Sequence, residues 1–155
     1  MERALKIAFC IALPLGIGGL SGFLTASEIS GWYETLQKPS FNPPNYIFGP
    51  VWTALYLLMG ISLLMVWNTG TTARKRKALL AFVIQLTLNF LWSILFFRMH
   101  RVDLALADIV LLWIAILSMM VYFYGVRKIA AFLQIPYLLW VTFATALNTA
   151  ILLLN

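Results

Sequence analysis

The stretch from Gly31 to Tyr56 reads GWYETLQKPSFNPPNYIFGPVWTALY and lies between two long apolar segments. It holds four of the chain's six prolines, with two tryptophans, three tyrosines and two phenylalanines. A connection between neighbouring helices usually needs only about 2–8 residues. A segment this long, stiff and aromatic indicates a structured cover over an apolar surface.

The composition places the chain in a membrane. Of its 155 residues, 63% are hydrophobic and only 10% are charged. A soluble domain has about 25% charged residues with which to cover its surface. This chain cannot cover a water-exposed surface, so lipid is its expected solvent. Its length predicts one domain, residues 1–155.

Five segments are long and apolar enough to span a bilayer, which takes about 20 residues. They are Ala4–Leu24, Pro50–Trp67, Ala78–Phe97, Leu104–Tyr124 and Ile129–Leu154. None alternates as barrel strands do, and the first is longer than a signal-peptide core. The sequence therefore predicts an all-α integral membrane bundle of five transmembrane helices. Residues 25–49 would form the first loop, a lid over a pocket.

The basic residues predict the orientation of this bundle. Eight would lie on the side of the N-terminus: Arg3, Lys6, Arg74, Lys75, Arg76, Lys77, Arg127 and Lys128. Only Lys38, Arg98 and Arg101 would lie on the other side. This bias favours an N-terminus inside and a C-terminus outside. Because the charges sit between apolar runs and not across one accessible face, nucleic acid is not an expected partner.

Polar side chains recur on two of the predicted helices. They are Gln85, Asn89 and Ser93 in the third segment, and Thr145, Asn148 and Thr149 in the fifth. The first three are four residues apart and so share one helix face. Polar groups within lipid usually face the bundle interior. Hydrogen bonding between helices is the simplest interpretation of each set.

Aromatic residues indicate a cavity at the outward end of the bundle. They are Trp32, Trp52, Trp92 and Trp140, with Tyr56 on the same helix stripe as Trp52. Apolar cavities with a few polar anchors are the usual small-molecule sites, and indole faces stack on flat conjugated rings. We expect such a cavity beneath the first loop, with Asn89 and Asn148 donating to a ligand carbonyl or carboxylate.

The titratable residues offer no conventional catalytic arrangement. The five acids are Glu2, Glu28, Glu34, Asp103 and Asp108, and no two share a helix face in the membrane interior. Cys10 and His100 are each the only residue of their type, so we expect no metal site and no acid–base catalysis. Asp108 lies within a predicted span, where an acid is a functional candidate. We favour pairing with Arg98 or Arg101, or capping, over proton coupling.

Motifs along nearly the whole chain resemble the TspO/MBR family, the translocator proteins also called peripheral-type or mitochondrial benzodiazepine receptors. In the first loop and second helix they are Gly31-Trp32-Tyr33, Leu36, Lys38-Pro39, Phe41, Pro43-Pro44, Phe48, Pro50-Val51-Trp52, Leu55-Tyr56 and Met59-Gly60. In later helices they are Leu88-Asn89, Trp92-Ser93, Phe96-Phe97, Pro136-Tyr137-Leu138, Trp140, Phe143-Ala144 and Leu147-Asn148. The short eukaryotic-style tail is missing, so the chain looks like a bacterial member, in the cell membrane.

The resemblance implies a pocket closed by the first loop that binds porphyrins, including protoporphyrin IX and haem, and synthetic ligands such as PK11195. Residue matching implies a lining of Trp32, Tyr33, Pro43, Trp52, Asn89, Trp140, Ala144 and Asn148, to which the stripes above add Tyr56 and Trp92. Sterol is a doubtful ligand, because Asn148 lacks the tyrosine and arginine that follow it in mammalian members. No cofactor is obligatory; porphyrin would be ligand or substrate.

Three functions remain open. The first, which we favour, is porphyrin binding for sensing, transport or buffering. The second is light- and oxygen-dependent degradation of protoporphyrin IX, with Trp52 and Trp140 shaping the reaction. The third is a small multidrug-type transporter. The resemblance also implies a homodimer, for which the small face around Gly18 and Gly22 is a candidate, although packing within the chain is the simpler interpretation of these glycines.

Overall fold

The computed structural model describes residues 2–155 and contains, within them, helices and no strands. Their bounds are α1 Glu2–Ser30, α2 Trp32–Thr35, α3 Asn45–Trp67, α4 Ala73–Ser93, the π-helical turn η1 Ile94–Arg98, α5 Val102–Val126, α6 Lys128–Phe132 and α7 Ile135–Leu154. Counting η1 with α4 and α6 with α7, five of these described helices are long and apolar enough to cross a membrane. The predicted all-α membrane bundle of five helices is confirmed.

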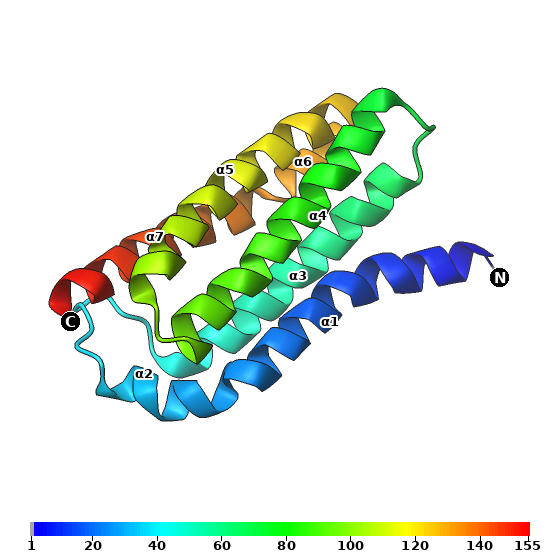
Figure 1. Cartoon of the computed structure of the whole chain (residues 1–155). Helices are drawn as coiled ribbons and strands as arrows, with labels where there is room; N and C mark the ends of the chain where they lie inside the picture. The colour runs from blue at the N-terminus through cyan, green and yellow to red at the C-terminus, as the bar shows by residue number, and fades with distance from the viewer. Residues whose placement is uncertain (1) are drawn as a thin grey trace.

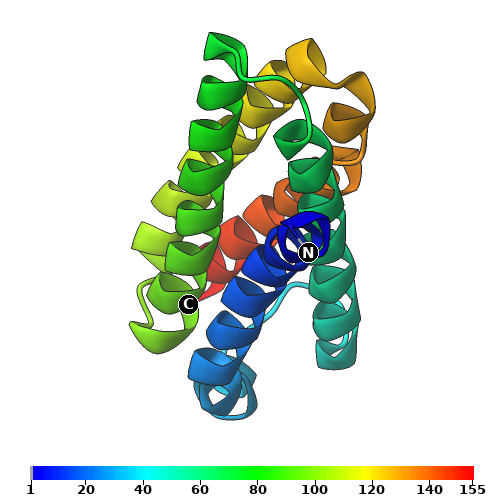
Figure 2. The same ribbon diagram turned by 90° about the vertical axis from the view of Figure 1, so that its right-hand side faces the viewer.

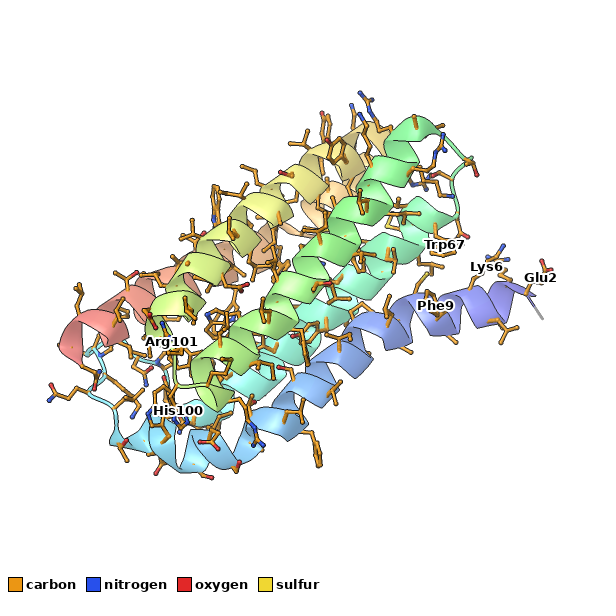
Figure 3. All side chains as sticks on the ribbon, viewed as in Figure 1. Glu2, Lys6, Phe9, Trp67, His100 and Arg101 are labelled. Carbon is orange, nitrogen blue, oxygen red and sulfur yellow. The ribbon has the colours of Figure 1, made fainter. Side chains whose placement is uncertain are left out.

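The long helices run up and down the bundle (Figure 1). α4 packs closely along α5, α5 packs on α7, and α1 packs mainly on α3. The beginning of α1 diverges from the other helices, as Figures 1 and 2 show from two sides. Its Phe9 still touches Trp67 at the far end of α3, with ring centroids 6.0 Å apart (Figure 3). The bundle therefore has a tight centre and a first helix that packs on α3 but diverges at its beginning.

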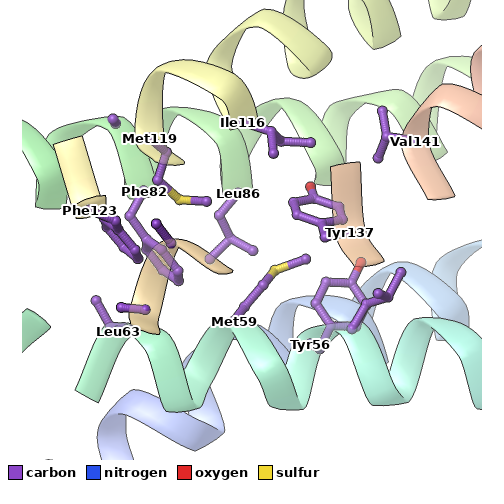
Figure 4. Close-up of a cluster of buried hydrophobic side chains, with 14 of the residues drawn as sticks. Tyr56, Met59, Leu63, Phe82, Leu86, Ile116, Met119, Phe123, Tyr137 and Val141 are labelled. Carbon is purple, nitrogen blue, oxygen red and sulfur yellow. The ribbon is translucent and has the colours of Figure 1, made fainter. Parts of the chain in front are cut away.

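The core lies between α3, α4, α5 and α7 (Figure 4). Met59, Ile116 and Met119 are fully buried there. Phe82 and Phe123 stack with centroids 6.3 Å apart and planes at 6°. Because lipid tails are as apolar as these side chains, close packing and hydrogen bonds, more than exclusion of water, hold such a core together.

The helix ends differ from the predicted ones, and the first loop is shorter than residues 25–49. α1 continues to Ser30 and α3 begins at Asn45, directly after Pro44. Pro50, the predicted first residue of the second span, lies inside α3. The apolar run predicts only the part of a helix that prefers lipid. The helical backbone continues beyond that run through polar residues. The connection is therefore residues 31–44, which we call the lid; it includes the single turn α2.

Two glycines set the distance between α1 and α3. A Cβ on Gly18 would clash with the Tyr56 ring, and one on Gly60 would lie 2.9 Å from the carbonyl oxygen of Cys10. Both positions need glycine because the partner helix occupies the space of a side chain. A Cβ on Gly22 would meet nothing within 4 Å. Gly18 therefore packs within the chain, and the homodimer stays a prediction.

Candidate ligand-binding cavity

A cavity of about 330 Å³ lies beneath the lid, at the end of the bundle where α3 begins and α7 ends. Its lining comes from α1, the lid, α3, the end of α4 with η1, and α7. Cavities of about 300–1,000 Å³ with mainly apolar walls are typical small-molecule sites. Four of the five long helices and the lid thus surround the kind of space that the aromatic residues predict.

The aromatic wall is built around Trp52 of α3 and Trp140 of α7. Their ring centroids are 6.5 Å apart and their planes are perpendicular, at 88°. Trp52 stacks on Tyr56 at 5.6 Å, and Phe48 meets the Trp140 ring edge-on at 5.9 Å. Edge-to-face and offset-stacked pairs are the favoured aromatic geometries. The neighbouring rings therefore hold both indoles in fixed orientations before any ligand is bound.

Seven of the ten predicted site residues line this cavity: Tyr33, Trp52, Tyr56, Trp92, Trp140, Ala144 and Asn148. Trp32, Pro43 and Asn89 do not line it. The sequence analysis missed the contribution of α1, whose lining residues include Gly19, Ser21, Gly22 and Thr25. It also missed Phe48, Phe96 and Phe97. Phe96 and Phe97 lie in the π-helical turn η1, which follows α4 directly.

Asn89 is placed behind the wall, where the structure gives it a different task from the predicted ligand donor. It is 1% exposed, and its Oδ1 accepts a 2.5 Å hydrogen bond from the Tyr56 hydroxyl. Its Nδ2 donates to the Tyr137 hydroxyl at 3.1 Å, and Tyr137 donates onward to Gln85 at 2.9 Å. Both the oxygen and the nitrogen of the Asn89 amide therefore have hydrogen-bond partners. Asn89 therefore fixes Tyr56 in the wall, and ligand contact would come through Tyr56.

Asn148 lines the cavity, but its amide also has partners in the bundle. Its Oδ1 accepts from Trp92 Nε1 at 3.1 Å, and its Nδ2 donates to the Val102 carbonyl at 3.0 Å. These bonds join α4, α5 and α7 at the lid end. Each side-chain amide has two donors and two acceptor lone pairs. Asn148 thus keeps capacity for a ligand while holding the Trp92 ring at the wall.

Three sets of contacts fix the lid. Tyr33 is buried, and its hydroxyl donates to Asn42 Oδ1 at 2.8 Å. Burial raises the pKa of Tyr33, and the hydrogen bond with Asn42 opposes that rise. The phenol therefore stays protonated as the donor. Asn155 accepts from the Gln37 backbone N–H at 2.9 Å and donates to the Gln37 carbonyl at 3.0 Å, which joins the lid to the end of α7.

The third contact involves His100, in the short turn between η1 and α5. Its ring stacks on Trp32 with centroids 4.2 Å apart and planes at 13°. Its Nε2 lies 2.9 Å from Glu28 Oε2 near the end of α1. The backbone of His100 has φ 54°, in the left-handed region that few residues other than glycine adopt. Trp32, predicted to contact the ligand, instead contacts this histidine and the edge of Phe96.

The predicted ion pair of Asp108 with Arg98 or Arg101 was wrong. Arg101 binds Asp103, with Nε–Oδ1 and Nη2–Oδ2 distances of 2.8 and 2.6 Å. Asp103 is close in sequence to Arg101 at the surface, whereas Asp108 is buried between helices. Within residues 2–155, Asp108 Oδ2 has no hydrogen-bond partner. In the same part of the chain, no three His, Cys, Asp or Glu side chains are grouped as metal ligands.

Comparison with known proteins agrees with this architecture. The model of the TspO/MBR family matches residues 10–154. A "Tryptophan-rich protein TspO" from Archaeoglobus fulgidus is 47% identical over 152 residues, which cover 97% of each chain. A "Tryptophan-rich sensory protein" from Cereibacter sphaeroides is 37% identical over all of this chain and 94% of its own. The Homo sapiens "Translocator protein" is 38% identical, over 92% of this chain and 85% of its own. The chain therefore belongs to the TspO/MBR family of multi-pass membrane proteins.

Proposed function

We propose that the cavity binds flat, largely apolar ligands with conjugated rings, above all porphyrins such as protoporphyrin IX and haem. The observation that carries this proposal is the perpendicular pair of Trp52 and Trp140 beside an apolar space of about 330 Å³. One indole would present its face to the ring and the other its edge. Because both are already fixed by Tyr56 and Phe48, binding would cost little ordering of the wall.

The polar groups of such a ligand would lie at the rim. Asn45, at the start of α3, is an exposed lining residue, whereas the central wall is aromatic. Porphyrin carboxylates directed toward Asn45 would stay hydrated while the macrocycle leaves water. The same wall suits synthetic aromatic ligands such as PK11195. The names of the relatives, which include "Translocator protein" and "Tryptophan-rich sensory protein", support a sensory or translocator role for ligand binding at the membrane.

We also propose a localisation and an orientation in the membrane. The structure supports a multi-pass membrane protein through its five apolar helices. We place it in a bacterial cell membrane with the N-terminus inside and the C-terminus outside. The lid would then face outward. Reaction of cysteines introduced at Lys38 and at Lys77 with an impermeant thiol reagent tests this orientation, because only the cysteine at residue 38 should react in intact cells.

Quenching of tryptophan fluorescence by protoporphyrin IX tests ligand binding. We expect saturable quenching at micromolar porphyrin, and about tenfold weaker binding in Trp140→Leu, which loses about 1.4 kcal/mol of ring contacts. Trp113→Leu is the matched control, because Trp113 donates to Thr142 at 2.8 Å and lies outside the cavity lining. Absence of saturable quenching in the unaltered protein would overturn the proposal.

Light- and oxygen-dependent degradation of bound protoporphyrin IX is the second candidate. The two cavity indoles favour it, because an excited porphyrin held against them can react with oxygen away from bulk water. We expect a product spectrum under light that free porphyrin in the same detergent does not give. Trp52→Phe and Trp140→Phe should each abolish that product while leaving porphyrin bound. Equal rates with and without protein would exclude a catalytic role.

A further inference from the structure

One side of the cavity reaches the outer surface of the bundle. Between α1 and α3 its lining includes Gly19, Gly22, Gly49 and Thr53. All four residues are exposed. Apart from Asn45 at the rim, the remaining lining, including Trp52, Trp140 and Ala144, is at least partly buried. The cavity therefore has an opening between these two helices, and we call these four residues the α1–α3 opening.

The glycines of this opening do not serve helix packing. A Cβ added at Gly19, Gly22 or Gly49 would meet nothing within 4 Å. By contrast, Gly18 and Gly60, also at the α1–α3 interface, have no room for a Cβ. The two helices are thus in close contact at Gly18 and Gly60 and separate beyond Gly18. The small residues beyond that point leave a passage clear of side chains.

The surface around the opening is apolar. Leu20 and Phe23, next to the two α1 glycines, are 47% and 81% exposed, and Leu57 on α3 is 43% exposed. Exposed large apolar side chains on a membrane-spanning helix face lipid. Gly19 and Gly22 lie within α1, one of the helices that cross the bilayer. The opening therefore faces hydrocarbon and not water.

The lid offers no comparable passage. It is fixed by the stacking of Trp32 on His100, by the bond between Tyr33 and Asn42, and by the two bonds between Gln37 and Asn155. A ligand entering through the lid would have to break several of these contacts together. A ligand entering between α1 and α3 would break none of them.

We propose that ligands enter and leave the cavity sideways, from the lipid phase, through the α1–α3 opening. This inference rests on the proposed ligand binding and adds its route. It also defines the ligand class further: the molecule must first partition into the membrane, so apolar porphyrins bind faster than equally flat but highly charged ones. The lid then stays in place on the aqueous side throughout the binding cycle, with Asn45 at its edge in water.

A reversible block of the opening tests the route. Gly22→Cys, in a Cys10→Ala background and in lipid nanodiscs, is modified with a bulky methanethiosulfonate reagent. Stopped-flow tryptophan quenching by protoporphyrin IX then gives the association and dissociation rates. We expect both rates to fall by about tenfold or more, and by more than any change in affinity, since an obstacle on the only route raises the barrier in both directions. Reduction of the label should restore both rates.

Gly16→Cys is the matched control. Gly16 also lies exposed on α1 with no atom within 4 Å of an added Cβ, but it does not line the cavity. The same label there should leave both rates unchanged. Asn155→Ala, which releases the lid at Gln37, should also leave the rates of the labelled Gly22→Cys protein low.

Each contrary outcome has a distinct meaning. Unchanged rates with label at residue 22, or rates restored by Asn155→Ala, would overturn the sideways route. So would weaker affinity caused by faster dissociation, because the label would then occupy the cavity and not the passage. A change of oligomeric state on labelling would assign this face to a second copy and also overturn it. Absence of saturable quenching before labelling would overturn the proposed function itself.

Discussion

Asn89 offers the sharpest test of how the cavity wall is held. In Asn89→Leu the Tyr56 hydroxyl loses its acceptor, whereas Tyr137 still donates to Gln85. A buried hydroxyl without a partner costs about 1–3 kcal/mol, while single hydrogen bonds within membranes average about 0.6 kcal/mol. We therefore expect Asn89→Leu to lower the free energy of unfolding by about 1.5 kcal/mol.

A double-mutant cycle separates this bond from other effects of the substitution. Tyr56→Phe removes the same hydrogen bond from the other side and keeps the ring that packs against Gly18. Unfolding in mixed detergent micelles, with increasing denaturing detergent, measures each variant. We expect Asn89→Leu to cost about 1 kcal/mol less in the Tyr56→Phe background than in the unaltered protein. A coupling energy near zero would refute the hydrogen bond as the link between the two residues.

Porphyrin affinity in the same four proteins distinguishes support from ligand contact. Because Asn89 lies behind Tyr56, Asn89→Leu should change the dissociation constant by no more than about twofold once Tyr56→Phe is present. A further loss of about tenfold or more in that background, about 1.4 kcal/mol, would mean that Asn89 binds the ligand itself. The reasoning from the buried hydrogen-bond pattern would then be refuted.

Three other changes test the packing and the lid. Gly18→Ala should destabilise the protein by about 1–3 kcal/mol because it forces a tyrosine ring to move, whereas Gly16→Ala, with free space around it, should not lower the midpoint of unfolding. Gly60→Ala should cost at least as much as Gly18→Ala, since its Cβ would meet backbone atoms that cannot rotate away; an unchanged midpoint would contradict this contact. Asn155→Ala should speed amide hydrogen exchange around Gln37 by about fivefold, through loss of about 1 kcal/mol, and unchanged exchange there would show that other contacts hold the lid.

Hydropathy predicted much of the fold, and the spacing of the aromatic residues predicted the aromatic wall of the cavity. Runs of about 20 apolar residues predicted the five spans, and Trp52 and Trp140 lie at the predicted end of the bundle. The helix ends were not predicted, because the helices continue through polar residues such as Asn45 and Ser30. Hydropathy measures preference for lipid, and the backbone continues to form helical hydrogen bonds beyond the apolar run.

The roles of the polar residues could not be predicted from the sequence, because they depend on contacts with side chains from other helices. Asn89 and Asn148 are both buried amides near tryptophans, yet only Asn148 reaches the cavity. The difference comes from Tyr56 and Tyr137, which lie on other helices and surround Asn89. The wall formed by α1 was missed for a similar reason. From the sequence, Gly22 was a candidate packing residue, and only the position of α3 shows that the space beside it is open.

Pro14 interrupts the backbone hydrogen bonding of α1 within its span. A proline cannot donate the backbone bond to the residue four positions earlier, so the Cys10 carbonyl, which faces Gly60, is free of its helical partner. Pro14 lies between the contact at Gly60 and the contact at Gly18. Bending at Pro14 would move the half of α1 near the lid, while the contact at Gly60 keeps the half near the N-terminus in place. The free-energy cost of widening the cavity is then the bending energy of one helix plus its contacts with Tyr56 and His100, with the packed core of the other four left intact.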